Sequence, residues 1–318
     1  QDSSWQLYLN SLRMVSYLCN AFEETGEDKY IQKAKEITQD WIENNPNDKS
    51  NSNNWAWADH PVSSRILTMT YLLEMLKRQE TVDYRFVDQL LKSLFEHAEY
   101  QLSDKYYKFP HNHGVMQDRS LIQMAFLMSK FKESEKWMNI SLNRLEKQIN
   151  TFVSDSGVHL EHSPYYHAYT LELFQSIEEL LVSRGKTLGE NTSKILEKMK
   201  TYLAFVTQPN LKLPNVGDTI EYALDPNKDY NHDYLQYVAT KGREGVKPHE
   251  VSKVYSDAGV AIFRDSWKEY GEFDKTTYLM FQAGYHSHVH KHADDLSFVM
   301  NAMGEDIFIG PGKYTYTD

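Results

Sequence analysis

The segment from His286 to Asp295 concentrates side chains that can bind a metal ion or move a proton. It reads His-Ser-His-Val-His-Lys-His-Ala-Asp-Asp, so histidine recurs at every second position. In an extended segment alternate residues share one face, and four imidazoles followed by a carboxylate on one face could bind a metal. A plain polar loop has the same composition, so the segment alone leaves both interpretations open.

Residues 110–114, Pro-His-Asn-His-Gly, place an amide beside imidazoles in a loop between two predicted helices. An amide can donate hydrogen bonds to a carboxylate, and an imidazole can take up a proton near neutral pH. Asn112 and His113 are therefore candidates for acid–base chemistry. The alternative is a helix-capping asparagine followed by a loop histidine.

A third segment, residues 155–167, runs from a turn towards the start of a predicted helix. Ser163 suits the N-cap of that helix and Pro164 its first position. The next residues, Tyr165 and Tyr166, can project from the helix start into a cleft. Packing of both rings against the following helix is the alternative.

A fourth segment, Trp55 to Arg65, places two tryptophans before an arginine at a predicted helix start. The guanidinium fork matches two oxygens of a carboxylate or a sulfate, although a surface arginine on a helix is commoner. The chain is also rich in aromatic residues, with 22 Tyr, 14 Phe and 6 Trp. Such rings can bind sugars, or they can fill the contacts between helices.

The elements that would position these segments are mostly helices. Apolar residues recur at three- and four-residue intervals up to about residue 245, which is typical of amphipathic helices. The connections are mostly short, which favours antiparallel helix hairpins. Two helices are predicted between Trp5 and Trp41. Further helices are predicted at residues 62–79, 84–102, 118–131, 134–151, 166–184 and 190–207.

The pattern changes to short apolar runs near residue 250. Strands are predicted at 259–264, 277–281, 296–300 and 307–309. Helices followed by strands indicate two domains, residues 1–250 and 251–318. Because so few strands form a poorly covered sheet, we expect the second domain to be truncated.

Charge and composition exclude some classes of protein. The net charge of −11 argues against a general nucleic-acid binder, whose surface is basic. It allows an acidic glycan, because a cleft can be locally positive. No apolar run approaches the roughly 20 residues of a membrane-spanning helix, and no signal peptide is visible at Gln1. A single cysteine, Cys19, excludes an internal disulfide framework.

Taken in order, these segments resemble the heparinase II/III-like polysaccharide lyases. Residues 290–298, His-Lys-His-Ala-Asp-Asp-Leu-Ser-Phe, are similar to the family's H-x-H-A-D-x-L-S-F stretch, and Gly304 to its following hairpin. Residues 112–114 resemble the family's catalytic Asn-His pair, and residues 163–167 the segment that carries its catalytic tyrosine. Residues 57–65 resemble its Trp/His/Arg segment.

The resemblance implies an α+β multidomain fold, an incomplete (α/α) toroid followed by an antiparallel β-sandwich of which only the first strands are present. It also implies a polysaccharide lyase that cleaves uronic-acid glycans, such as a glycosaminoglycan or alginate, by β-elimination. Such enzymes commonly meet their substrates outside the cytoplasm, so a secreted or periplasmic location is expected. The oligomeric state is left open.

Several roles follow from the resemblance alone. Asn112 would hold the carboxylate of the uronate, and Tyr166, which directly precedes the histidine of the family pattern, would be the acid and could also be the base. His113 or His290 would act as base or help to neutralise the carboxylate, depending on the epimer. The other side chains expected to bind the substrate are Trp57, His60, Arg65, Tyr165, Arg119, Glu161 and His288.

The resemblance also bears on a metal. His292 stands where relatives have a first metal ligand, but Gly310 stands where they have an aspartate ligand. One remaining histidine does not meet zinc's usual need for three or four protein ligands. We therefore expect no cofactor. The other option is Zn or Ca, held with the help of Asp294, Asp295 or Asp306.

Two rival functions remain at this point. A glycoside hydrolase would need two carboxylates about 5–9.5 Å apart. The candidates for such a pair are Asp59, Asp155, Glu161 and Asp218. A non-catalytic glycan-binding relative that keeps the fold is the second rival, and the glycine at position 310 keeps it open.

Overall fold

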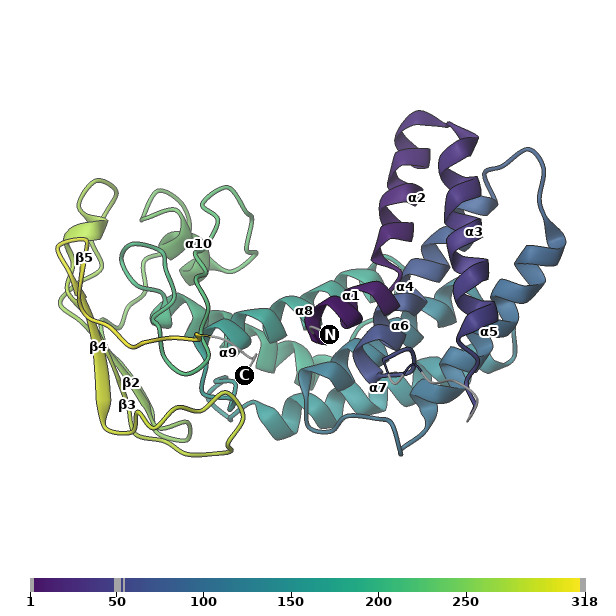
Figure 1. Cartoon of the computed structure of the whole chain (residues 1–318). Coiled ribbons are helices and arrows are strands. Elements are labelled where there is room, and N and C mark those ends of the chain that lie inside the picture. Colours follow the sequence, from purple (N-terminus) through teal and green to yellow (C-terminus); the bar gives the residue numbers. More distant parts are fainter. Residues whose placement is uncertain (1–2, 49–52, 54, 315–318) are drawn as a thin grey trace. The chain divides into compact units, whose positions relative to one another are not determined.

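The structure is a computed structural model that describes residues 3–48, 53 and 55–314. Contacts between residues group the chain into two compact units, residues 1–148 and 149–318. Helices come first and strands last, as predicted (Figure 1). The predicted domain boundary near residue 250 differs from this grouping and stays a prediction.

The first unit is helical. The helix α4 lies at its centre and packs against α1, α2, α3, α5 and α6. Its buried side chains include Val62, Ile66, Met69 and Leu72. In Figure 1, α2 and α3 run side by side as a helix hairpin. The helices are α1 (Ser3–Asn10), α2 (Arg13–Thr25), α3 (Asp28–Asn44), α4 (Asp59–Leu76), α5 (Tyr84–Leu102), α6 (Asn112–Leu127) and α7 (Glu133–Phe152), whose last residues belong to the second unit.

The second unit adds three helices and an antiparallel sheet. The helices are α8 (Pro164–Val182), α9 (Glu190–Val206) and α10 (Asp233–Ala239), and a short 3-10 helix, η1, covers Phe273–Lys275. The strands are β1 (Lys253–Tyr255), β2 (Val260–Arg264), β3 (Tyr278–Gln282), β4 (Ser297–Ala302) and β5 (Glu305–Phe308). β1 was not predicted from the sequence.

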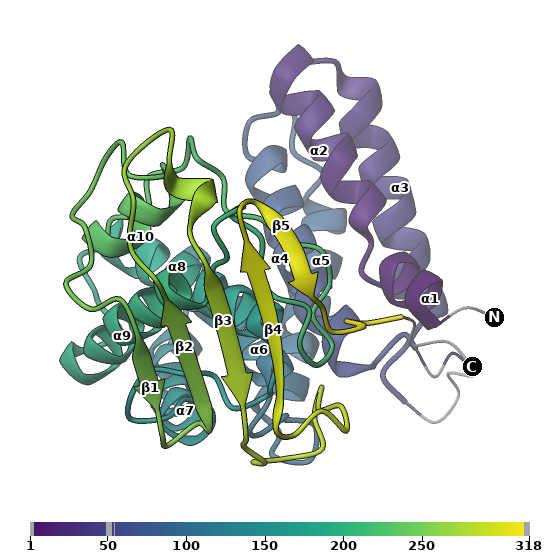
Figure 2. The same cartoon turned by 90° about the vertical axis from the view of Figure 1, so that its left-hand side faces the viewer.

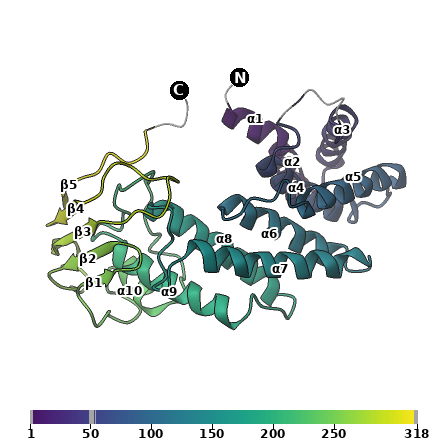
Figure 3. The same ribbon diagram turned by 90° about the horizontal axis from the view of Figure 1, so that it is seen from below.

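The strands lie in chain order, β1-β2-β3-β4-β5, and each pairs with the next (Figure 2). The register places Ile262 opposite Met280 and Met280 opposite Val299, and all three side chains are buried. The hydroxyl of Tyr278 donates to the carbonyl of Val206, 2.8 Å away, at the end of α9. In Figure 3, α9 and α10 lie next to the strands. The helices thus cover one face of the sheet and supply its core.

Two helix starts matter for the site. α8 begins as predicted, with Pro164 in its first turn and the hydroxyl of Ser163 accepting from the amide of Tyr166. α6 begins at Asn112, earlier than the predicted residue 118, because the Nδ1 atom of His111 accepts from the amide of His113. None of the described helices is long and apolar enough to cross a membrane.

Candidate functional site

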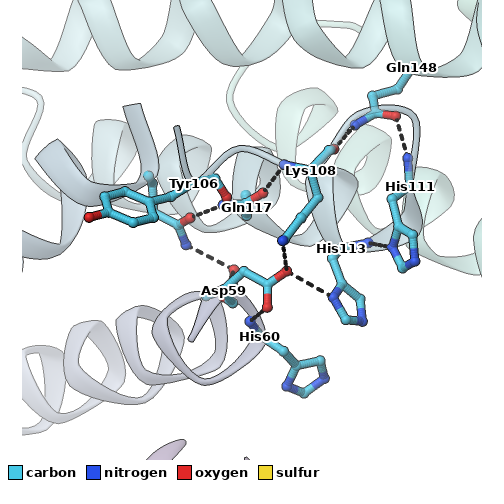
Figure 4. A network of polar contacts seen from close by, with 10 residues as sticks. Asp59, His60, Tyr106, Lys108, His111, His113, Gln117 and Gln148 are labelled. Carbon is cyan, nitrogen blue, oxygen red and sulfur yellow. Dashed lines mark hydrogen bonds and ion pairs between the residues drawn. The ribbon is translucent and has the colours of Figure 1, made fainter. Parts of the chain in front are cut away.

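The first unit gathers Asp59, His60, Lys108, His111 and His113 into what we call the Asp59 cluster (Figure 4). Asp59 and His60 are the first residues of α4. His113 lies in the first turn of α6, and His111 is its N-cap. The cluster is therefore built where two helices begin and a loop ends.

The loop of the Asp59 cluster is fixed by two glutamines. The Gln148 amide donates to the carbonyl of Lys108 at 2.8 Å and accepts from the amide of His111 at 3.1 Å. The side-chain oxygen of Gln117 accepts from the amide of Lys108 at 2.9 Å. Both glutamines are drawn beside the loop in Figure 4. The backbone that carries His111 and His113 is thus held by buried side-chain contacts.

Asp59 is the charged centre of its cluster. One carboxylate oxygen accepts from the amide of His60 at 2.8 Å, and the other lies 3.1 Å from Nδ1 of His113. Lys108 Nζ lies 4.0 Å from the second oxygen. Burial alone would raise the pKa of Asp59, but the contacts with His113, the His60 amide and Lys108 bring this pKa to about 2. Asp59 is therefore an anion at neutral pH.

Asn112 directly precedes His113 and is buried. Its side-chain oxygen has no hydrogen-bond partner among the described residues. An asparagine amide can present either end after a flip, and its assignment follows from its hydrogen-bond partners. The Asn112 amide therefore keeps hydrogen-bonding capacity that no described residue uses.

Arg65 differs from the predicted substrate-binding role. Its side chain is fully buried, and it donates to Nε2 of His97 at 2.7 Å, to the carbonyl of Ala56 at 2.8 Å and to the carbonyl of Asn10. Its guanidinium also lies 3.7 Å from the centre of the Trp41 ring. Arg65 therefore holds parts of the first unit together and presents no donor to solvent.

Trp57 and Arg119 are less buried than Arg65. The Trp57 ring packs on His97 with 4.6 Å between ring centres, and its indole N–H donates to the carbonyl of Asn45 at 3.0 Å. Arg119 is half-buried on α6. The substrate-binding roles of Trp57, Arg119 and His60 stay predictions.

The second unit brings Glu161, Tyr166, Asp218, His290 and His292 together as the Asp218 cluster. The Tyr166 and His290 rings are stacked, with 3.5 Å between their centres and 10° between their planes. Tyr166 lies in the first turn of α8. Two residues far apart in the sequence, both predicted to be catalytic, are thus in direct contact.

His290 lies between two carboxylates. Its Nδ1 atom is 2.9 Å from one oxygen of Asp218, and its Nε2 atom is 3.4 Å from Glu161. The second oxygen of Asp218 is 2.8 Å from Nε2 of His292. Asp218 was weighed from the sequence only as a hydrolase carboxylate, and its contact with both histidines was missed.

The approach of these segments depends on Gly217. This residue has a φ of +55°, in the left-handed region, and a Cβ added to it would lie 2.5 Å from the carbonyl oxygens of both His162 and His290. A larger residue would therefore force Asp218 away from the two histidines.

The segment before His290 forms a second group of rings. His286 stacks on His162 with 5.4 Å between ring centres, and the exposed His288 packs edge-on against Tyr285 at 5.3 Å. Nε2 of His162 accepts from the amides of His286 and Ser287. Burial lowers the pKa of His162 to about 4, with nearby His286 adding to the effect.

Tyr165, the neighbour of Tyr166, packs against other tyrosines. Its ring is edge-on to Tyr166 at 5.2 Å and to Tyr222 at 6.1 Å. Tyr166, by contrast, stacks on a histidine. The stacking of Tyr166 on His290 places an imidazole directly against the tyrosine predicted to be catalytic.

The residues considered for a metal have other partners among the described residues. His292 contacts Asp218, Asp294 and Asp295 both bind Lys291, and Asp306 accepts from Asn301. A Cβ at Gly310 would meet the carbonyl oxygen of Asn215, so an aspartate has no room there. Among the residues that the structure describes, no group of three or more His, Cys, Asp or Glu could hold a metal ion.

The chain is similar in sequence to proteins described as heparin-sulfate lyases. The chain is 24% identical to a heparin-sulfate lyase of Bacteroides stercoris over 98% of its own length and 50% of the relative. It is 26% identical to a heparin-sulfate lyase of Bacteroides thetaiotaomicron over 78% of its length and 38% of the relative. The chain thus spans half or less of these relatives.

Solved structures show the same fold. The crystal structure of heparinase III matches 97% of the chain and 50% of that protein, with a TM-score of 0.84 and 23% identity. That of heparan sulfate lyase from Pedobacter heparinus matches 100% of the chain and 51% of that protein, with a TM-score of 0.78 and 21% identity. The predicted fold class, an incomplete (α/α) toroid followed by an antiparallel β-sandwich, is confirmed.

Two family models account for nearly the whole chain. Residues 1–242 match the heparinase II/III N-terminus, and residues 247–318 match the heparinase II/III-like C-terminal region. The match includes the helix starts that carry His113 and Tyr166 and the segment that carries His290. With both regions matched in order, the chain belongs to the heparinase II/III family.

Proposed function

We propose that this protein is a polysaccharide lyase that cleaves an acidic, uronic-acid-containing glycosaminoglycan by β-elimination. The observation that carries the proposal is the contact between Tyr166 and His290, with Asp218 and Glu161 on the two nitrogens of the imidazole. The relatives described as heparin-sulfate lyases support an acidic glycan as substrate.

The reaction needs three chemical roles. A group that neutralises the uronate carboxylate acidifies the C5 proton, and a base then removes that proton. The electron pair of the C5–H bond forms the C4–C5 double bond, and the bond from C4 to O4 breaks. An acid protonates O4 as it leaves, so the product carries an unsaturated uronate.

We assign the roles residue by residue. Asn112 suits the carboxylate, because its amide N–H can donate to a carboxylate and its side-chain oxygen has no partner among the described residues. Tyr166 suits the acid, since its ring is held flat against His290 and its phenol can donate a proton. His113 and His290 are the two candidates for the base or for further neutralisation.

A glycoside hydrolase has less support. Within the second unit, Glu161 and Asp218 approach opposite nitrogens of one imidazole ring, so His290 occupies the space between them. A glycosidase needs its two carboxylates on either side of a sugar. The pair is therefore arranged to hold a histidine.

Ultraviolet absorbance of unsaturated uronate tests the proposal. The protein would be incubated with heparan sulfate, hyaluronan and alginate. We expect rising absorbance with at least one glycan and a rate roughly 10²- to 10⁴-fold lower in Tyr166→Phe. Tyr17→Phe is the matched control, because Tyr17 is exposed on α2.

Other outcomes would contradict the proposal in different ways. Shortened glycans without absorbance would indicate hydrolysis. Bound but intact glycans, with affinity unchanged in Tyr166→Phe, would indicate a binding protein. A large polymeric substrate also favours action outside the cytoplasm, and cell fractionation would test the proposed secreted or periplasmic location.

A further inference from the structure

The contact between Asp59 and His113 joins two helix starts that are 54 residues apart in the chain. Oδ2 of Asp59 lies 3.1 Å from Nδ1 of His113. Oδ1 of Asp59 is fixed separately by the amide of His60 at 2.8 Å. Since both oxygens have defined partners, the carboxylate plane is set by α4, and it in turn orients the imidazole on α6 (Figure 4).

The protonation of Asp59 determines which atom carries the shared proton. The contacts with His113, the His60 amide and Lys108 outweigh burial and bring the pKa of Asp59 to about 2. An ionised carboxylate can only accept hydrogen bonds. Nδ1 of His113 must therefore donate, which leaves Nε2 of a neutral ring as a proton acceptor.

The surroundings of His113 hold the ring in this orientation. The His60 ring packs edge-on against it with 5.4 Å between ring centres, and the His111 ring does so at 4.4 Å. Nδ1 of His111 accepts from the amide of His113, so that nitrogen is occupied. Lys108, with its Nζ 4.0 Å from Asp59, adds a further charged group at the contact. The His113 side chain stays about one-third exposed, at 33%.

We propose that Asp59 is a positioning residue that keeps the proton of His113 on Nδ1 and so makes Nε2 the nitrogen that exchanges protons with substrate. The importance of Nε2 for turnover rests on the proposed lyase function. The position of the proton does not, because it can be measured in the protein without substrate.

Nitrogen chemical shifts of the imidazoles test the position of the proton directly. In ¹⁵N-labelled protein at neutral pH, the resonances of His113 are identified by their loss in His113→Gln. We expect the pattern of an Nδ1–H ring in the wild type and a shift towards Nε2–H in Asp59→Asn. Asp88→Asn is the matched control, because Asp88 is exposed on α5 and pairs only with Lys92 among the ion pairs of the described residues.

A wild-type spectrum with the pattern of an Nε2–H ring would overturn the proposal. This outcome does not depend on whether Asp59→Asn folds. An Nδ1–H pattern that persists in a folded Asp59→Asn would overturn it as well. Circular dichroism of each variant establishes folding.

Kinetics then separate positioning from the lyase function. With a glycan that is cleaved, we expect kcat to fall roughly 10- to 100-fold in Asp59→Asn, with KM within about twofold and Asp88→Asn unchanged. A loss confined to KM would contradict positioning. If no glycan is cleaved but the tautomer responds as expected, the lyase proposal fails and the positioning of His113 stands.

Discussion

The Asp59 and Asp218 clusters each contain a contact between an aspartate and a histidine, but the two aspartates differ in their other partners. In the first, one oxygen of the carboxylate faces His113 and the other accepts a backbone amide. In the second, the two oxygens of Asp218 face His290 and His292. The Asp59 cluster orients one imidazole, whereas the Asp218 cluster links two.

The His113 and His290 rings also differ in their surroundings and in their exposure to solvent. Nε2 of His290 lies 3.4 Å from Glu161, so both sides of that ring face a carboxylate. The side chain of His113 is one-third exposed, at 33%, whereas that of His290 is only 14% exposed. A partly exposed ring with one carboxylate suits proton exchange, and a less exposed ring between two carboxylates suits the support of Tyr166.

Asp218→Asn should have the largest effect, because it weakens the support of both His290 and His292. We expect kcat on a cleaved glycan to fall by roughly 10²- to 10³-fold, which exceeds the loss in Asp59→Asn. Initial rates by ultraviolet absorbance measure this. Asp155→Asn is the control, since Asp155 is exposed in the same unit. An effect smaller than that of Asp59→Asn would reverse the ranking of the two clusters.

Asp59→Asn should also lower stability in a pH-dependent way. The pKa of Asp59 falls from 3.8 to about 2 on folding, so the ionised group stabilises the fold above pH 4, and this contribution is lost as pH falls through about 2. The expected loss in the free energy of unfolding at pH 7 is about 2 kcal/mol.

Urea unfolding at pH 7, 5 and 3 measures this effect, with Asp88→Asn as the control. The gap between wild type and Asp59→Asn should narrow at pH 3. A gap that stays constant across this range would show that the substitution acts through packing and not through the charge of Asp59.

Local patterns in the sequence predicted the helix starts well. Ser163 and Pro164 indicated where α8 begins, and the structure has that cap. The start of α6 was placed too late, because a histidine is an uncommon N-cap and His111 was not considered as one. Caps depend on neighbours within a few residues, so the sequence alone can reveal them.

The carboxylate partners of the histidines could not be predicted in the same way. Asp59 is 54 residues from His113, and Asp218 is 72 residues from His290. No spacing rule joins residues so far apart. Arg65 was misjudged for a related reason, since its acceptors on Asn10 and Ala56 come from other segments, and only their convergence buries the guanidinium.

A smaller effect is expected at His162, which anchors the segment next to His290. The pKa of this imidazole is lowered from 6.5 to about 4 by burial and by the nearby cations. Its stabilising contribution is therefore present above pH 6.5 and is lost as pH falls through about 4. Protonation would remove the acceptor used by the amides of His286 and Ser287.

Hydrogen exchange of those two amides, corrected for intrinsic rates, measures the loosening between pH 7 and 4. The amide of Leu296 is the control, because it donates to the backbone carbonyl of Gln282, which does not titrate. If the protection factor of His286 falls no more than that of Leu296 between pH 7 and 4, His162 is not a titrating anchor.

The smallest effect is expected from metal removal, and it tests whether charge alone holds the Asp218 cluster. Asp218 contacts both His290 and His292, and Gly310 has no room for a side chain. Dialysis against EDTA should therefore leave the thermal unfolding midpoint and the turnover rate unchanged. A lower midpoint that Zn or Ca restores would show that a cation binds, and His292→Ala would then locate it: if the restoration is lost in that variant, the contact of His292 with Asp218 is part of a metal site.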